Sequence, residues 1–274
     1  MLFHEPEAFL AEVEDIARLG ADRLMKFWRS LEPGQINEKA RNDLVSAADL
    51  ASEQAILGAV QERFPDHRIL SEEAGWSGDA GTGPTWFVDP LDGTTNFIHG
   101  IPQFAISIGV AVGAEIEYGV IFDPCKDDIF SAARGRGARW NGRPCNVSDR
   151  NGLPGALLAT GFPFKAHRLL DPYLAIFRDV FLRCKAIRRP GAAALDLAYT
   201  ACGIFDGFFE FQLSAWDIAA GALIVEEAGG VISDMDGQGN YLDSGNVVCG
   251  SPGVHRELLE VVQSHGDEWR EKTG

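Results

Sequence analysis

The N-terminal part of the chain carries apolar side chains at the spacing of helices. Apolar and small residues recur every three or four positions from Phe9 to Leu31, which predicts one long amphipathic helix. A second helix is predicted to begin near Ser46, where the segment SAAD has the spacing of a capping box, and to end before Pro65. We therefore expect two long helices ahead of the first strands.

Short β-rich runs follow these helices. They are separated by glycines and polar pairs, as in an antiparallel meander, and they lie at 85–89, 104–112, 117–123 and 128–133. The next segment, RGRGARWNG at 134–142, lacks the G-K-[ST] ending of a phosphate-binding loop, and we interpret it as a hairpin. This order of elements is typical of an α+β unit.

After NGLPG at 151–155, predicted strands and helices alternate. Strands are expected at 156–162, 184–188, 204–211, 230–233 and 247–250. Helices are expected at about 168–182, 192–202, 215–228 and 254–264. Because no linker, repeat or low-complexity tract divides the chain, we predict two tightly packed halves, an α+β half at 1–150 and an α/β half at 151–274.

The composition is that of a globular protein with an acidic surplus. The chain has 274 residues, 46% of them apolar, and its formal charge of −16 does not suit a non-specific nucleic-acid binder, which needs a basic footprint. A phosphate substrate is not excluded, because bound cations can reverse the local sign of charge. The five cysteines form no C-x-x-C pair, and we find no signal peptide or long apolar run, so we expect reduced thiols, no membrane span and a cytoplasmic location.

The segment VDPLDGTTNF at 88–97 contains the groups that a metal site needs. Its apolar strand is expected to end at Asp89, because Pro90 cannot continue the sheet pairing. A turn between Asp89 and Asp92 can bring both carboxylates and the carbonyl of Leu91 to one point. This is the all-oxygen ligand set that Mg²⁺ prefers.

The residues after Asp92 suit an anion. Gly93 and Thr94 lie at a predicted helix start, where free N–H groups and hydroxyls can bind phosphate. A plain Asx-turn before a capped helix would account for Asp92 and Thr94, but not for Asp89, Pro90 and the glycine together. A haloacid-dehalogenase-type phosphatase is excluded, because its D-x-D-G-T signature needs a nucleophilic aspartate where Pro90 stands.

Two further acidic segments are candidates. Glu72 and Glu73 follow the apolar run RILS, and an isolated pair of this kind is usually two solvated surface acids. In SAWDIAAGALIVEEAGG at 214–230, Asp217 has capping-box spacing from Ser214. Asp217 either caps a helix or is aimed into a crevice by the close packing that the small face AAGA implies, and both interpretations remain open at this point.

Taken together, EEAG, DPLDGTTNF and WDIAAGALIVEEAGG resemble the signatures of the inositol monophosphatase family of Mg²⁺-dependent, lithium-sensitive phosphatases. The stretches DLVSAAD, GALLATGFPF and PGAAALDLAY also fit, so the resemblance covers nearly the whole chain. It implies a layered α-β-α-β-α sandwich of the inositol monophosphatase and fructose-1,6-bisphosphatase type, with the active site between the two halves. It also implies an Mg²⁺ cofactor, a small phosphorylated polyol as substrate and a homodimer. From the net charge and the lack of a long apolar run, we expect no nucleic-acid or membrane partner.

By motif position, the resemblance implies roles for individual residues. The implied metal ligands are Glu72, Asp89, the carbonyl of Leu91, Asp92 and Asp217. The implied catalytic residues are Glu72, Asp92 and Thr94, with Glu72 and Thr94 orienting the attacking water. The implied substrate contacts are Gly93, Thr94, Gly191, Ala193, Glu210 and Asp217. Lys39, upstream of the DLV stretch like a lysine common in the family, and Glu73, an acid beside the ligands, are additional candidates.

The activity that follows is hydrolysis of inositol monophosphate to inositol and phosphate, with Mg²⁺ activating the attacking water. The alternative within the family is the same chemistry on fructose-1,6-bisphosphate, histidinol phosphate or a 3′-phosphonucleotide. Two hypotheses from other classes compete with it. One is a non-catalytic regulatory protein that keeps the metal site, and the other is a two-carboxylate glycosidase that a chelator would not inhibit.

Overall fold

The computed structural model describes residues 5–40, 43–78, 83–164 and 166–273. The helices in this part of the chain are α1 (Pro6–Leu24), η2 (Pro33–Gln35), α2 (Ala47–Arg63), α3 (Thr94–Ile98), η3 (His167–Leu169), α4 (Leu170–Phe181), α5 (Ala193–Ala201), α6 (Ala215–Glu227), α7 (Tyr241–Ser244), α8 (Pro252–Ser264) and α9 (Gly266–Thr273). The strands are β1 (Ile36–Ala40), β2 (Asp43–Ser46), β3 (Arg68–Ser71), β4 (Gly75–Ser77), β5 (Thr85–Asp92), β6 (Ala105–Val112), β7 (Glu115–Asp123), β8 (Asp128–Ala133), β9 (Ala138–Trp140), β10 (Arg143–Pro144), β11 (Leu157–Thr160), β12 (Ala186–Arg188), β13 (Gly207–Glu210), β14 (Val231–Ser233) and β15 (Val247–Gly250).

An eight-stranded sheet lies in the first half of the chain, with the strand order β10-β9-β8-β7-β6-β5-β3-β4. The strands from β5 to β10 pair antiparallel, which confirms the predicted meander, whereas β3 runs parallel to β5. The predicted hairpin at 134–142 is present as the turns on the two sides of β9. Strands β1 and β2 form a separate two-stranded antiparallel sheet that the sequence analysis did not predict.

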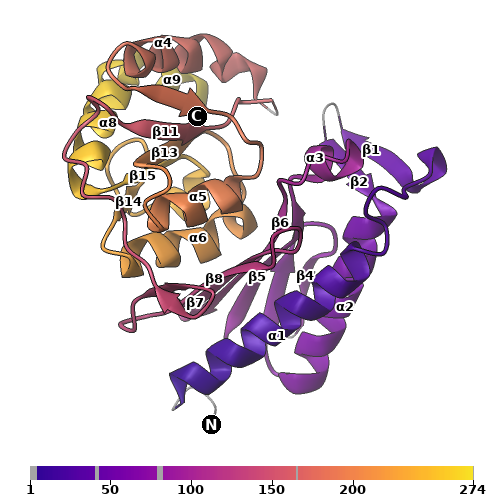
Figure 1. Ribbon diagram of the computed structural model, residues 1–274. Coiled ribbons are helices and arrows are strands. Elements are labelled where there is room, and N and C mark those ends of the chain that lie inside the picture. Colours follow the sequence, from indigo (N-terminus) through magenta and orange to yellow (C-terminus); the bar gives the residue numbers. More distant parts are fainter. Residues whose placement is uncertain (1–4, 41–42, 79–82, 165, 274) are drawn as a thin grey trace.

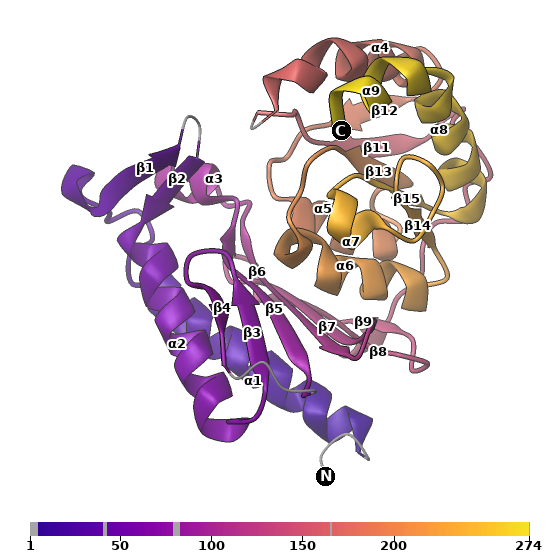
Figure 2. The same ribbon diagram turned by 180° about the vertical axis from the view of Figure 1, so that it is seen from behind.

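The second sheet has five strands in the order β12-β11-β13-β15-β14. Helices α1 and α2 cover the outer face of the first sheet, α5 and α6 lie between the two sheets, and α4 and α8 cover the outer face of the second (Figures 1 and 2). This arrangement confirms the predicted α-β-α-β-α sandwich. The division into two halves near residue 150 stays a prediction, because α5 and α6 belong to the second half but pack against both sheets.

The backbone of α6 lies close to the backbone of the first sheet, and this contact fixes the position of the middle layer of helices. A Cβ atom on Gly109 of β6 would lie 2.7 Å from the Cβ of Ala219, and one on Gly119 of β7 would lie 2.6 Å from the carbonyl oxygen of Ala220. Small residues on both sides therefore let α6 lie directly on the sheet, as the AAGA pattern predicts. This contact places the first turn of α6, which contains Asp217, over β5 and β6.

The first helix is shorter than predicted. α1 ends at Leu24, although the apolar periodicity continues to Leu31. After α1 the chain turns, and Trp28 packs against Phe97 and Phe104 with ring centroids 5.2 and 4.7 Å away. The last apolar residues of the pattern, Phe27 and Leu31, are thus partly buried in a cluster with Phe97 and Phe104 rather than along the face of one helix.

Candidate active site

A cavity of about 510 Å³ opens where the ends of β5, β11 and β13 meet the first turns of α5 and α6. It brings together residues that the sequence analysis selected from distant segments. Those that line it are Glu72, Asp89, Leu91, Asp92, Gly93, Thr94, Gly191, Ala193, Glu210 and Asp217. Within the described residues, Glu73 does not line the cavity, although it adjoins Glu72. Lys39 belongs to β1, and its side chain lies outside the described residues.

The end of β5 differs from the prediction and shapes the site. The strand does not stop at Asp89, because Pro90 is accommodated in a bulge and β5 continues to Asp92. Asp89 pairs with Ser107 of β6 and Asp92 pairs with Ala105, so three steps along β5 match two steps along β6. A bulge of this kind tolerates proline and changes the direction of side chains next to it. Here it lets Asp89 and Asp92 both line the cavity.

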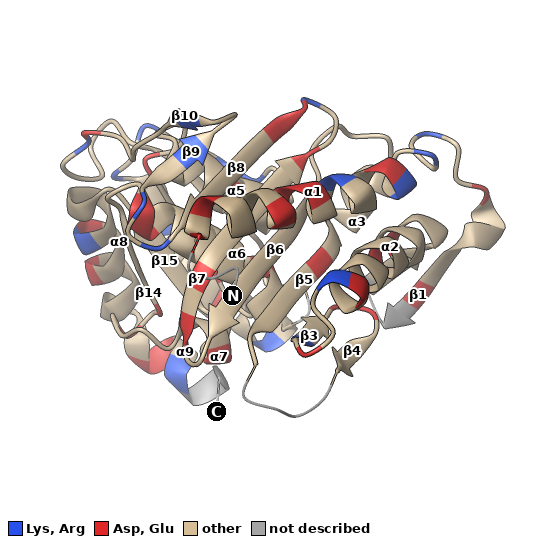
Figure 3. Ribbon diagram, turned by 90° about the horizontal axis from the view of Figure 1, so that it is seen from below, with Lys and Arg blue, Asp and Glu red and all other residues tan. Residues whose placement is uncertain are grey.

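The carboxylates of the site disfavour one another's ionisation. Acidic residues occur on many elements, β5 among them (Figure 3). Asp89 is only 2% exposed, and its burial raises its pKa well above the usual range, with added repulsion from Glu72, Asp217 and Asp92. Burial raises the pKa of Asp92 to about 8, with repulsion from Asp217 as the next cause. The backbone N–H of Ala194, which donates to Asp92 Oδ2 at 2.7 Å, acts in the opposite direction.

The donors of this cavity fit a hard divalent cation. Within the described residues, no three Asp, Glu, His or Cys side chains form a ready metal cage. The cavity nevertheless gathers four carboxylates and the Leu91 carbonyl, all of them oxygen donors of the type that Mg²⁺ binds. Because these acids repel each other in its absence, a cation would lower the energy of the cluster.

Thr94 is held by a residue that the sequence analysis treated only as part of a helix cap. The hydroxyl oxygen of Thr94 lies 3.1 Å from Asp49 Oδ1 and 3.1 Å from the carbonyl oxygen of Leu91. Asp49 is fully buried in α2, and its other oxygen accepts from the backbone N–H and the hydroxyl of Ser46 at 2.9 and 2.6 Å. Burial raises the pKa of Asp49. The SAAD segment signalled the cap, but only the fold shows that the same carboxyl reaches Thr94.

Asp217 combines both of the roles that the sequence left open. Its Oδ2 accepts the backbone N–H of Ser214 at 2.7 Å, so it caps α6. It also repels the carboxylates of Asp89 and Asp92, which places it in the same cluster. The buried hydroxyl of Ser107 donates to the carbonyl of Trp216 at 3.1 Å and ties this turn to β6 beside Asp89.

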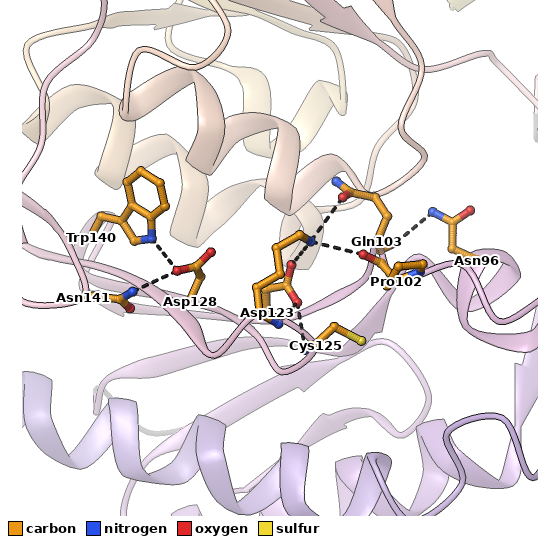
Figure 4. A network of polar contacts seen from close by, with 9 residues as sticks. Asn96, Pro102, Gln103, Asp123, Cys125, Asp128, Trp140 and Asn141 are labelled. Atoms are coloured by element: carbon orange, nitrogen blue, oxygen red, sulfur yellow. Dashed lines mark hydrogen bonds and ion pairs between the residues drawn. The ribbon is translucent and has the colours of Figure 1, made fainter.

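Asn96 joins two walls of the cavity and was not predicted. Its side-chain amide lies 2.8 Å from the carbonyl oxygen of Gln103 and 2.9 Å from that of Pro190. Figure 4 shows the first of these contacts at one end of a polar network. In this network Lys126 donates to the carbonyl of Pro102 at 3.1 Å and to the buried carboxylate of Asp123. The loop after α3 and the segment before α5 are therefore fixed to each other.

The far wall of the cavity contains two more acids. Glu210 ends β13, and burial raises its pKa to about 8 although the Arg189 guanidinium acts in the opposite direction. Gly161 leaves the space for it, because a Cβ atom there would overlap the Glu210 carboxylate. Asp196 of α5 is 1% exposed, its Oδ1 has no hydrogen-bond partner among the described residues, and burial raises its pKa. Asp196 was not a sequence candidate, since inside PGAAALDLAY it looks like one polar residue of an apolar helix.

Comparisons with known proteins agree on one family. Residues 6–267 match the model of the Inositol monophosphatase family. A Pseudomonas aeruginosa protein named Nus factor SuhB is 46% identical over 253 residues, which are 91% of this chain and 93% of that protein. The crystal structure of extragenic suppressor protein suhB from Bartonella henselae is 37% identical with a TM-score of 0.90, covering 93% of this chain and 98% of that one. The structure of inositol monophosphatase from Anabaena is 35% identical with a TM-score of 0.84, covering 94% and 96%.

These comparisons correct the predicted partners. We expected a small phosphorylated polyol, no nucleic acid, no membrane and a homodimer. The expectation that a small molecule is the only partner and that nucleic acid is not involved is wrong, because relatives that match 89–94% of the chain are named Nus factors, a term for proteins of transcription complexes. The error has a physical reason, since net charge sums over the whole chain and does not report a local surface through which a protein joins an assembly. Separately, none of the described helices is long and apolar enough to cross a membrane.

Proposed function

Because the chain belongs to the inositol monophosphatase family, we propose that it is an Mg²⁺-dependent phosphomonoesterase that hydrolyses inositol monophosphate to inositol and phosphate. One observation carries the proposal. Four acids from three separate segments, Glu72, Asp89, Asp92 and Asp217, line one cavity together with Thr94. Such a concentration of mutually repelling carboxylates is unfavourable unless a cation compensates it or the acids take part in chemistry.

The residues proposed to hold the metal are Glu72, Asp89, Asp92 and Asp217 together with the carbonyl of Leu91. Bound Mg²⁺ would supply an activated water and would offset the negative charge that develops on the phosphoryl oxygens. No protein nucleophile is required for this chemistry, which agrees with the absence of a catalytic cysteine or serine signature from the sequence.

The protein's own groups are proposed to orient the reactants. The Thr94 hydroxyl, directed by Asp49 Oδ1 at 3.1 Å, and the Glu72 carboxylate hold the attacking water. Backbone N–H groups of Gly93 and Thr94, at the start of α3, hold phosphate oxygens. On the alcohol side, Gly191, Ala193 and Glu210 face the same cavity and are proposed to bind substrate hydroxyls.

The test is a phosphate-release screen with and without Mg²⁺. The substrates are inositol 1-phosphate, fructose-1,6-bisphosphate, histidinol phosphate and a 3′-phosphonucleotide, and the variant is Asp92→Asn. We expect Mg²⁺-dependent release that is fastest with inositol 1-phosphate, and a loss of about 100-fold or more in the variant, since each 1.4 kcal/mol of transition-state stabilisation is about tenfold in rate. Millimolar lithium should inhibit. Activity that survives EDTA would reject the metal-dependent reaction, and preferred turnover of another ester would reject the substrate.

We further propose a cytoplasmic location for this activity. All five cysteines lie in the described residues as free thiols. Disulfides are rare in reducing compartments and common in secreted proteins, so free thiols support the proposal. Fractionation of cells with an antibody to the chain would test it, and recovery of the protein outside the cytoplasmic fraction would contradict it.

The names of the relatives support a second proposal, that the chain also acts as a Nus factor. In a strain that lacks the chain, readthrough of a reporter behind a transcription terminator would be measured after return of the wild type or Asp92→Asn. We expect both to restore readthrough if the two functions use different parts of the molecule. If the wild type restores nothing, the second proposal fails and the phosphatase proposal stands unaffected.

A further inference from the structure

Helix α2 carries three buried polar side chains on one face. Asp49, Ser52 and Glu53 are spaced so that they lie on the same side of the helix, and their exposed fractions are 0%, 0% and 5%. Burying a polar group costs free energy unless a hydrogen bond compensates it, so apolar residues usually fill such positions. All three side chains are in fact bonded, each to a different segment that lines or adjoins the candidate active site.

The three contacts are distributed over the acidic side of the cavity. Asp49 holds the hydroxyl of Thr94, as described above. The hydroxyl of Ser52 donates to the carbonyl of Pro90 at 3.0 Å, inside the bulge between Asp89 and Asp92. Glu53 reaches the segment after β3.

One carboxylate oxygen of Glu53 accepts three hydrogen bonds from the residues around Glu72. Its Oε1 accepts the backbone N–H groups of Glu73 and Ala74, at 3.0 Å each, and the hydroxyl of Ser71. The donors belong to residues 71, 73 and 74, so they lie on both sides of Glu72 in the chain. A carboxylate has only acceptor sites and can take several donors at once, and hydrogen bonds to a charged acceptor are stronger than neutral ones.

We propose that Glu53 is a positioning residue that fixes the turn carrying Glu72, so that the Glu72 carboxylate is presented to a divalent cation in the cavity. The proposal rests on the proposed function, because it assigns Glu72 to the metal. The backbone N–H of Glu72 donates to the carbonyl of Val88 at 3.1 Å, which anchors the same turn to β5. Glu53 on one side and β5 on the other therefore hold the turn. The side chain of Glu72, which belongs to this turn, lines the cavity.

The first test measures Mg²⁺ binding by titration calorimetry without substrate. Glu53→Ala is expected to weaken Mg²⁺ binding about tenfold or more, in line with the usual effect of removing a group that orients a metal ligand. Glu53→Gln keeps an acceptor oxygen at the same position and is expected to recover most of the affinity. The matched control is Glu62→Ala, which removes an exposed acid from the same helix and should leave the affinity unchanged.

A double-mutant cycle separates positioning from general destabilisation. If Glu53 acts through Glu72, Glu53→Ala should not weaken Mg²⁺ binding further in a Glu72→Ala background. A further, independent loss would overturn the proposal, and so would a folded Glu53→Ala protein with wild-type affinity. If Glu53→Ala does not fold, Glu53→Asp provides the same test, since it keeps the charge but is one methylene too short to reach the turn. If the wild type binds Mg²⁺ but cleaves no phosphate ester, the proposed function is refuted, whereas the role of Glu53 in positioning Glu72 is not.

Discussion

Glu210 makes the stability of the metal-free protein depend on pH in a way that can be measured. Burial raises the pKa of this carboxyl from 4.5 to about 8. The folded state therefore binds the proton more tightly than the unfolded chain does. Its contribution to stability is fully present below about pH 4.5 and is lost as the pH rises through about 8. Replacing the carboxyl by an amide of the same shape, Glu210→Gln, removes this dependence.

The size of the effect follows from the two pKa values. Between about pH 5.5 and about pH 8.5, a change from 4.5 to about 8 lowers the free energy of unfolding by about 3 kcal/mol. This is an upper value, because Glu210 faces a cavity of about 510 Å³ whose water screens part of the charge. The free energy of unfolding should fall between these two pH values in both proteins. We expect the fall to be about 1–3 kcal/mol smaller in Glu210→Gln than in the wild type.

The assay is denaturant unfolding in EDTA at the two pH values. The comparison is the difference between wild type and Glu210→Gln, which isolates the titration of Glu210 together with its repulsion of Asp196. Glu260→Gln, a change of an exposed acid on α8, is the control and should follow the wild type. If wild type and Glu210→Gln lose the same free energy, the carboxyl is not held in the environment described for it.

Three further predictions concern the supports of the site. Asn96→Asp exchanges the amide donor that holds the carbonyls of Gln103 and Pro190 for an acceptor, and it should raise KM for the phosphate ester about tenfold, because each neutral hydrogen bond contributes about 0.5–1.5 kcal/mol. Asn141→Asp, elsewhere in the network of Figure 4, should leave KM unchanged, and equal KM values for the two variants would contradict the role of Asn96. Gly119→Ala should cost about 1–3 kcal/mol in denaturant unfolding, because its Cβ would lie 2.6 Å from a backbone oxygen of α6; an unchanged midpoint would mean that α6 can shift. Ser107→Ala releases the turn that carries Asp217 and should weaken Mg²⁺ binding about tenfold in calorimetry, whereas wild-type affinity would show that the α6 cap alone holds Asp217.

Much of the fold was predictable because local rules determine it. Period-two and period-3.6 patterns depend on neighbouring residues, and they correctly predicted most of the long helices and the meander, but they missed β1 and β2, which lie between α1 and α2. The layered sandwich was an expectation that came from the resemblance to a family. The cap at Ser46 and the close packing implied by AAGA were also readable, because side-chain size and capping chemistry act within a few residues. The resemblance to a family then selected the acids that the fold places in one cavity.

The sequence analysis missed or mispredicted those features that depend on contacts between residues far apart in the chain. The periodicity to Leu31 could not show that the residues after Leu24 leave the helix to pack against Phe97 and Phe104. Pro90 was expected to end a strand, but pairing with β6 absorbs it in a bulge. The partners were misjudged because a summed charge does not describe one surface.

The sequence by itself determined most of the helices and strands and which acids are available, since both are properties of short stretches. The tertiary structure alone decided what the buried polar residues do. Asp49 looks like a helix cap and Glu53 like an ordinary helical acid until the donors they bind, from the end of β3, the turn after it and the start of α3, come within about 3 Å. A buried carboxylate takes its role from the groups that satisfy it, and only the folded chain brings those groups to it.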